Sequence, residues 1–331
     1  MSSFDLYICT SFLDEDRNFS TNMNGKLVKA HLALFAAGSM WGLMSPVGKA
    51  AMDAGVTSLS LAFMRMAGAA VCFWIASLFA PKEKVSRGDF LQLFFASLLC
   101  IVFNQGLFIV GLSYTSPIDS TIITTSSPIL TMLLAALILK EPITSMKVSG
   151  VIIGAVGALV LVLSNHDASI EAGSIRGDVI CFIAQISYAL YLTIFKGLIM
   201  RYNVFTLMKW MFTYATICFS LFSFPDMSAM VHRSFPISVW LQVGYVVVFG
   251  TFIAYIFVLV GQKSLRPTVI SMYNYMQPVV GTIVSVLVGL ATFGWIKAFA
   301  SALIFMGVYI VTKSKSREQL QKEKITDKSK V

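Results

Sequence analysis

About ten hydrophobic stretches, each near 20 residues long, follow one another from His31 to Thr312 with only short polar breaks between them. A helix of that length crosses the roughly 30 Å hydrocarbon core of a lipid bilayer. Hydrophobic residues make up 57% of the chain and charged residues only 12%, and a soluble domain of this composition would expose large apolar patches. We therefore expect an all-α integral membrane protein.

The polar breaks divide the hydrophobic part of the chain into ten predicted spans. They cover residues 31–51, 58–80, 90–113, 117–139, 147–164, 177–196, 204–224, 237–262, 267–290 and 294–312. None of the loops between these spans is long enough to form a soluble domain.

Lysine and arginine are concentrated on alternate loops. The basic loops carry Lys26 and Lys29, Lys82, Lys84 and Arg87, Lys140 and Lys147, Lys196 and Arg201, Lys263 and Arg266, and finally Lys313, Lys315 and Arg317. The positive-inside rule places basic loops in the cytoplasm, so both termini are predicted to be cytoplasmic, which requires an even number of spans. This topology also accounts for the net charge of +9, and we expect no nucleic-acid partner.

The two halves of the chain resemble one another. Residues 111–162 align with residues 261–312 at one constant offset, which places Pro128 on Pro278. Five spans per copy is an odd number, so the second copy must lie upside down in the membrane relative to the first. Inverted repeats are common in secondary transporters, whose substrate sites lie near the midplane where the halves meet. We expect two inverted-topology five-helix repeats around a central cavity.

These observations divide the chain into four regions. Residues 1–29 are predicted to be a disordered cytoplasmic tail, and Met23 within them is a second candidate for the start of translation. Residues 30–165 and 175–313 are the two five-helix repeats, and residues 314–331 form a basic cytoplasmic tail. The first residues lack the basic, apolar and small-residue order of a cleaved signal peptide.

Several motifs along the spans are similar to those of a known family. They are Ser39-Met40-Trp41-Gly42 with Pro46, Gly111-Leu112-Ser113-Tyr114-Thr115-Ser116-Pro117, Ser127-Pro128-Ile129, Leu139-Lys140-Glu141-Pro142, and Gly150, Gly154 and Gly157. Taken in this order, they make residues 30–313 resemble the drug/metabolite transporter (DMT) superfamily, EamA type. The resemblance implies a ten-span carrier, often an exporter of amino acids or other metabolites, and usually in a bacterial inner membrane.

One acidic position departs from the pattern of the two repeats. Glu141 in the first half corresponds to Ala291 in the second, so a cytoplasmic structural latch built on this glutamate would exist in one half only. The glycines Gly150, Gly154 and Gly157 predict a helix-packing face, either structural or at a homodimer contact, although a monomer is sufficient.

Polar and aromatic residues inside the spans are the candidates for a solute pathway, because buried amides and phenols need hydrogen-bond partners. The prolines Pro128 and Pro278 free backbone carbonyls, which either line a pore or are satisfied by neighbouring helices. The predicted pathway residues are Trp41, Pro46, Arg65, Asn104, Ser127, Pro128, Gln185, Tyr188, Tyr191, Trp210, Tyr255, Tyr273, Asn274, Gln277 and Pro278. The aromatic and amide residues near Pro278 are the better candidates for substrate contact, because Ser and Thr can bond back to their own helix.

Charged residues inside spans are a second signal, because a charge at a helix centre costs roughly 2.5–3.5 kcal/mol on the insertion scale. Arg65 lies deep in the second span and is expected to face the cavity or to pair there. Lys49, Lys196 and Lys209 lie closer to span ends, where their side chains can reach the interface. Asp119 opens the fourth span, either as a helix cap or as a carboxylate for proton coupling.

The chain contains no phosphate-binding loop and no hydrolase motif, so we expect neither ATP hydrolysis nor an enzyme, and no cofactor or metal site. The prediction is a secondary active transporter that exports a small solute by alternating access, with the solute and the bilayer as its partners. A cationic cavity around Arg65 and Lys49 would suit organic anions. An aromatic cavity around Trp41, Tyr188 and Tyr273 would suit amino acids or drug-like solutes. The alternative is a lipid-modifying membrane enzyme or a scaffold subunit.

Overall fold

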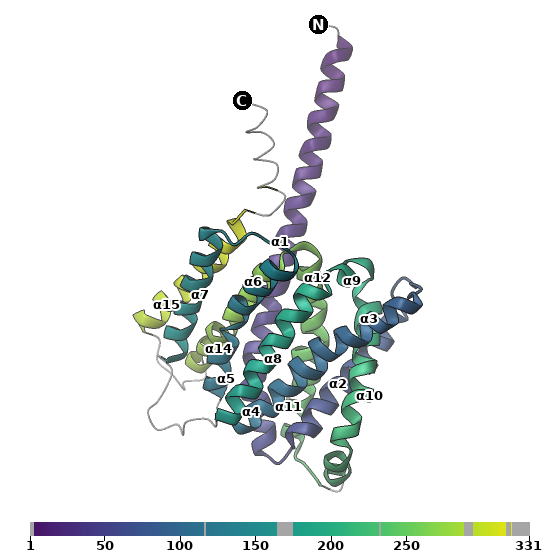
Figure 1. Cartoon of the computed structure of the whole chain (residues 1–331), viewed down its shortest axis with the longest axis vertical. Coiled ribbons are helices and arrows are strands. Elements are labelled where there is room, and N and C mark those ends of the chain that lie inside the picture. Colours follow the sequence, from purple (N-terminus) through teal and green to yellow (C-terminus); the bar gives the residue numbers. More distant parts are fainter. Residues whose placement is uncertain are drawn as a thin grey trace.

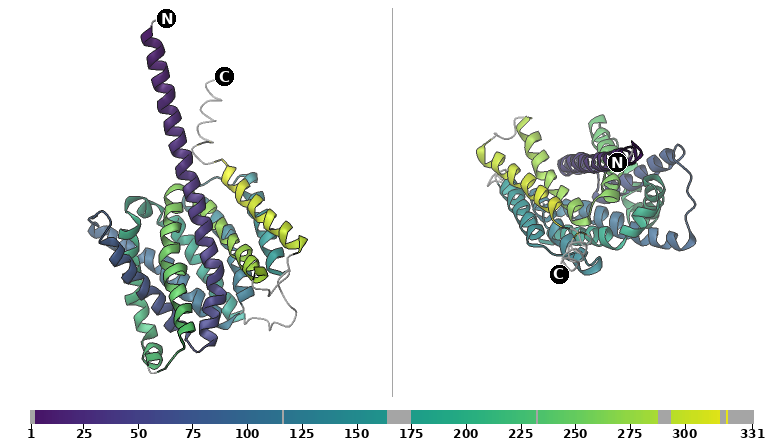
Figure 2. Two further views of the ribbon diagram at one scale, coloured as in Figure 1. Left: turned by 180° about the vertical axis from the view of Figure 1, so that it is seen from behind. Right: turned by 90° about the horizontal axis from the view of Figure 1, so that it is seen from above.

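The computed structural model describes residues 3–115, 117–163, 175–231, 233–287, 294–315 and 319. These residues form helices and connecting turns, with no β-strand among them, so the prediction of an all-α protein is confirmed for this part of the chain. Figure 1 shows a bundle of helices from which the first helix, α1, projects. The last helix, α15, ends on the side of the bundle from which α1 projects (Figures 1 and 2).

The first half of the chain contains seven α-helices and one π-helical segment. They are α1 (Ser3–Asp53), α2 (Ser58–Ser77), α3 (Arg87–Ser97), η1 (Leu98–Gly106), α4 (Leu107–Tyr114), α5 (Pro117–Thr124), α6 (Ser127–Ile138) and α7 (Ser145–Leu163). The segment α3, η1 and α4 is continuous and corresponds to the third predicted span.

The second half has a similar order, with α9 and η3 as additional elements. Its elements are α8 (Ile175–Ile194), α9 (Lys196–Arg201), α10 (Val204–Val231), α11 (Ile237–Val247), η2 (Val248–Ile253), α12 (Ala254–Ser264), α13 (Pro267–Met272), η3 (Tyr273–Tyr275), α14 (Met276–Leu287) and α15 (Trp295–Lys313).

Side-chain caps begin several of these helices. Thr57 accepts a hydrogen bond from the Ser60 amide at the start of α2, and Asn203 accepts one from the Thr206 amide at the start of α10. Such caps satisfy amides that have no partner within the helix. The equivalent helices α2 and α10 therefore both begin with a side-chain cap.

Within the described residues, nine helical segments are long and apolar enough to cross a membrane. They correspond to nine of the ten predicted spans. The remaining predicted span, 267–290, is divided between α13, η3 and α14. The sequence Tyr273-Asn274-Tyr275 forms the single 3₁₀ turn between its two α-helical parts. The number ten stays a prediction.

The N-terminal region differs from the expectation of a disordered tail over residues 1–29. The structure has α1 as one helix from Ser3, without a break before the first span. No proline lies between Ser3 and Lys29, so nothing in this segment prevents a helix from continuing backwards from the span. Of the predicted C-terminal tail, only residues 314, 315 and 319 are among the described residues.

Helix packing follows one pattern in both halves. Helix α1 packs along α12 and α14 of the second half, and α8, its counterpart, packs along α4 and α6 of the first half. The pairs α2 with α10 and α7 with α15 join equivalent helices. Exchanging the two halves therefore leaves these helix pairs unchanged.

Individual positions repeat this pattern. A Cβ atom at Gly111 would lie 2.6 Å from the Cys181 sulfur, and one at Gly261 would lie 2.5 Å from Leu34. Gly111 and Gly261 are paired by the constant offset of the repeat, and both allow a close approach to the opening helix of the other half. The π-helical segments η1 and η2 also begin at positions related by this offset. Such segments are frequent at functional sites.

Candidate functional site

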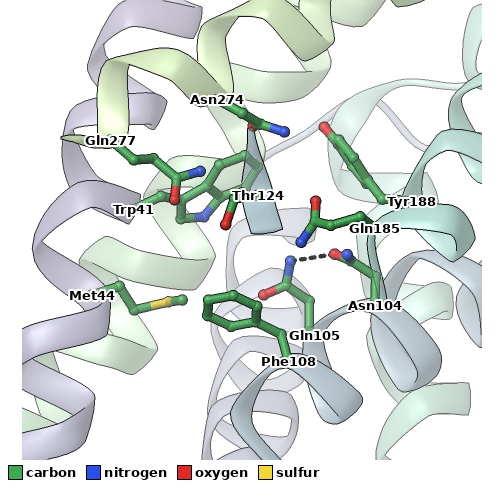
Figure 3. Close-up of a pocket in the computed structure, with 10 residues that line it drawn as sticks. All are labelled: Trp41, Met44, Asn104, Gln105, Phe108, Thr124, Gln185, Tyr188, Asn274 and Gln277. Carbon is green, nitrogen blue, oxygen red and sulfur yellow. Dashed lines mark hydrogen bonds between the residues drawn. The ribbon is translucent and has the colours of Figure 1, made fainter. Parts of the chain in front are cut away.

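A cavity lies between the two halves near the middle of the helices. It is lined by Trp41, Met44, Asn104, Gln105, Phe108, Thr124, Gln185, Tyr188, Asn274 and Gln277 (Figure 3). The side chains come from α1, η1, α4 and α5 of the first half and from α8, η3 and α14 of the second. The cavity measures about 40 Å³, which is room for about three water molecules at roughly 10–15 Å³ each.

Carboxamides provide half of this lining. The Asn104 Nδ2 donates to the Ala184 carbonyl at 2.9 Å, and the Gln105 Nε2 donates to the Asn104 Oδ1 at 2.8 Å (Figure 3). Gln185, Asn274 and Gln277 surround the same space in Figure 3, and no side-chain hydrogen bond to another described residue holds their amides. Gln185 and Asn274 are only 4% and 6% exposed, so the cavity is where these amides can find partners.

Aromatic rings form the other main part of the lining. The Trp41 Nε1 donates to the Gly250 carbonyl at 3.0 Å, which fixes the indole against the π-helical segment η2. The Trp41 ring meets Tyr188 and Tyr255 edge to face, with ring centroids 6.4 and 6.0 Å apart. Such arrangements are favoured for aromatic pairs, so these rings form a stable wall.

Arg65 lies behind this wall rather than in the lining. Its Nε donates to the Thr251 Oγ1 at 2.6 Å and its Nη2 donates to the Gly250 carbonyl at 3.2 Å. The side chain is buried, and the Nη1 has no hydrogen-bond partner among the described residues. Gly250 therefore accepts from both Arg65 and Trp41, which links the buried cation to the cavity wall.

Two smaller spaces share lining residues with the cavity or with each other. One, of about 10 Å³, shares Trp41, Tyr188 and Asn274 with the cavity. The next, also of about 10 Å³, shares Ile270 with the first and reaches Lys196 in a basic loop. We call these two spaces the narrow line, because their lining residues extend from the cavity wall to Lys196.

Two residues of the narrow line, Tyr273 and Gln262, take part in hydrogen bonds between helical elements. The His31 Nδ1 and the Tyr273 hydroxyl are 2.6 Å apart and join α1 to η3. The Tyr191 hydroxyl donates to the Gln262 Oε1 at 3.2 Å and joins α8 to α12. Both contacts join helical elements that border the narrow line.

Six predicted pathway residues line the cavity: Trp41, Asn104, Gln185, Tyr188, Asn274 and Gln277. Tyr273 lines the adjacent space, and Tyr191 and Tyr255 are buried beside these rings. The other predicted residues lie elsewhere. Pro46 is exposed on α1, whereas Ser127, Pro128 and Pro278 are buried outside the lining. Trp210 packs edge to face against Trp74 and Phe90.

The two acidic candidates lie away from the cavity. Asp119 is in the first turn of α5. Glu141, between α6 and α7, binds the Lys147 ammonium at 3.0 Å, and the two side chains are 10% and 1% exposed. Nearby, the Arg266 Nη2 donates to the Ser314 carbonyl at 2.8 Å beyond α15. Burial lowers the pKa of the Arg266 guanidinium, and the Glu141 carboxylate opposes this shift.

Four lining residues were outside the predicted set: Met44, Gln105, Phe108 and Thr124. Gln105 and Thr124 are polar residues inside spans, so their chemistry was a usable signal. Met44 and Phe108 have no such signal, because an apolar side chain in a span is as compatible with lipid as with a cavity. In the described part of the chain, no group of three or more His, Cys, Asp or Glu residues could hold a metal ion.

Comparison with known proteins agrees with this architecture. The EamA-like transporter family matches the chain twice, over residues 28–163 and 175–313. The repeated unit and the apolar helices define an integral, multi-pass membrane transporter. The chain belongs to the EamA-like transporter family, which confirms the resemblance to the EamA type of the DMT superfamily.

Two relatives are similar to this chain over more than half of its length. The uncharacterized transporter YyaM of Bacillus subtilis (strain 168) is 26% identical over 221 residues, which are 65% of this chain and 72% of YyaM. WAT1-related protein At3g56620 of Arabidopsis thaliana is 23% identical over 313 residues, or 86% of this chain and 82% of that protein. A solved crystal structure with 17% identity superposes with a TM-score of 0.68, covering 86% of this chain and 96% of the other, and shows the fold alone.

Proposed function

We propose that this chain is a secondary active transporter that moves a small solute through the central cavity by alternating access. The observation that carries the proposal is the polar cavity itself, which is buried in an apolar bundle and lined by both halves. Its volume of about 40 Å³ is too small for a metabolite, so the surrounding helices must move apart to admit one. Contacts such as that between His31 and Tyr273 would then break and re-form in each cycle.

Ten spans in two inverted repeats form part of this proposal. The pairs that α1 forms with α12 and α14 are matched by those that α8 forms with α4 and α6, and the family matches each half once. If the segment from Pro267 to Leu287 crosses the membrane as a broken helix, each half has five spans and the halves have opposite orientations. Broken helices that meet a midplane site are typical of such transporters.

The proposed orientation has both termini in the cytoplasm of a cell whose inner membrane holds the protein. The basic loops support this orientation by the positive-inside rule. Export as the physiological direction rests on the resemblance to EamA-type carriers. In this orientation the line of narrow spaces from the cavity to Lys196 is the cytoplasmic part of the pathway.

The test is solute counterflow in proteoliposomes containing the purified full chain. Vesicles loaded with one unlabelled solute from a panel of amino acids, organic anions, nucleobases and drug-like compounds receive the same labelled solute outside. Trp41→Ala removes an indole ring from the cavity lining. Trp240→Ala removes an exposed tryptophan of α11 and serves as the matched control. We expect saturable exchange that Trp41→Ala lowers at least tenfold and Trp240→Ala leaves within twofold. Absence of exchange for every solute with folded protein would refute the proposal.

A further inference from the structure

We propose that the solute of this cavity is uncharged and planar, with a hydrogen-bond donor and acceptor side by side on one edge, as in a nucleobase or another cyclic amide. The inference rests on the proposed transport function and names its substrate class. Three independent properties of the lining carry it: the amides without partners, the lack of charge and the aromatic faces.

The first property is the set of carboxamides without partners. Gln185 on α8, Asn274 on η3 and Gln277 on α14 make no side-chain hydrogen bond to another described residue, and all three line the cavity (Figure 3). Each carboxamide has a donor and an acceptor fixed in one plane. Asn and Gln pair in this way with the edge of adenine in nucleic-acid recognition, because the ring presents the complementary donor and acceptor.

The second property is the absence of charge. None of the described lining residues carries a formal charge at neutral pH. The buried cation Arg65 is outside the lining and directs its Nε and Nη2 to Thr251 and Gly250. A carboxylate or an ammonium group in this cavity would lose its hydration without gaining an opposite charge, which costs several kcal/mol per ion. Charged metabolites are therefore disfavoured relative to neutral ones.

The third property is the aromatic surface. Trp41, Phe108 and Tyr188 bring ring faces or edges to the same space as the amides. Rings that stack on the face of a planar heterocycle contribute roughly 1–3 kcal/mol in nucleic-acid binding and tolerate different bases. An amide edge together with aromatic surfaces matches a flat polar heterocycle better than an aliphatic amino acid, whose charged groups need ionic partners.

The test is competitive counterflow with labelled uracil in proteoliposomes of the full chain. Gln185→Met and Asn274→Leu remove amides from the cavity with little change in volume. Gln242→Met removes an amide of α11 that is outside the lining and is the matched control. We expect saturable uracil exchange that adenine and hypoxanthine inhibit, while leucine, glutamate and lysine at the same concentration do not. Loss of one good hydrogen bond should raise the half-saturating concentration about tenfold in each cavity variant.

Two results would overturn the substrate class while leaving the transport function intact. One is that the protein exchanges an amino acid or organic anion but neither uracil nor another planar neutral heterocycle, and that Trp41→Ala abolishes this exchange. The other is uracil exchange with the same half-saturating concentration in Gln185→Met, Asn274→Leu and Gln242→Met. If folded protein exchanges no solute in the wider panel, the transport function fails together with the substrate class.

Discussion

The contact between α7 and α15 gives a quantitative test of the packing between the halves. A Cβ atom at Gly307 would lie 2.6 Å from the Gly150 carbonyl oxygen and 2.7 Å from the Gly154 nitrogen. Both neighbours are backbone atoms, which no rotamer change can move. Reaching an ordinary contact distance of 3.4 Å requires the helices to separate by about 0.8 Å at this point.

The expected effect of Gly307→Ala follows from two opposing terms. Overpacking of this kind costs about 1–3 kcal/mol, whereas alanine in a helix is favoured over glycine by about 0.5–1 kcal/mol. We therefore expect a net loss of about 1–2 kcal/mol. With an unfolding entropy of roughly 2.1 cal/mol/K per residue, the midpoint of a 331-residue chain shifts by roughly 1–2 °C per kcal/mol, so it should fall by about 1–4 °C.

Gly244→Ala is the matched control for this substitution. Nothing lies within 4 Å of a Cβ atom at Gly244, which is inside α11. Only the helix-propensity gain remains, so its midpoint should rise by about 0.5–2 °C. Tryptophan fluorescence of the purified protein during heating measures both midpoints. A midpoint for Gly307→Ala at or above that of the unchanged protein would refute the close approach of α7 and α15.

Three further substitutions test other contacts. Glu141→Gln leaves the buried ammonium of Lys147 without its carboxylate and should destabilise the protein by about 3 kcal/mol. Adding Lys147→Met should restore most of the lost stability. Equal unfolding midpoints for the single and double variants would contradict this. Tyr273→Phe removes the hydrogen bond to His31 beside the narrow line and should increase thiol labelling of Ile270→Cys about fivefold. Unchanged labelling would count against a gate at this contact. Arg65→Lys cannot maintain both guanidinium contacts and should slow solute exchange about tenfold, whereas a wild-type rate would show that neither contact matters.

The positions of the spans could be predicted from the sequence with good accuracy. The second span was predicted over 58–80 and the helix is Ser58–Ser77, and the eighth was predicted over 237–262 and its helical segment is Ile237–Ser264. Span length is a local property, because a continuous apolar run has to match the thickness of the bilayer. The seventh span was predicted too short, since α10 continues through Pro225 to Val231.

Interruptions within the spans were harder to predict. The prolines Pro128 and Pro278 indicated where regular helix would be disturbed, and breaks occur close to both, after Thr124 and at Tyr273–Tyr275. The π-helical segments η1 and η2 contain no proline. Residues of η2 make tertiary contacts, such as the bonds from Trp41 and Arg65 to the Gly250 carbonyl. Such contacts join residues more than 180 positions apart and leave no local pattern.

The chemistry of the site was easier to predict than the direction of each side chain. Amides such as Asn104 and Gln185 were identified because they are costly in lipid, and both line the cavity. Trp210 was in the same predicted set but packs against Trp74 and Phe90 instead. Lipid and protein core are both apolar, so hydropathy does not distinguish the inward face of a membrane helix from the outward one.

The most direct test of the central claim is the accessibility of the cavity from each side of the membrane. Gln277→Cys places a thiol in the lining, and a membrane-impermeant maleimide can be applied to the outer or the inner face of oriented vesicles. A carrier that alternates access predicts labelling from either face, slowed by the transported solute, without ion conductance. Labelling from one face only under all conditions, or steady conductance with both faces open together, would contradict alternating access through this cavity.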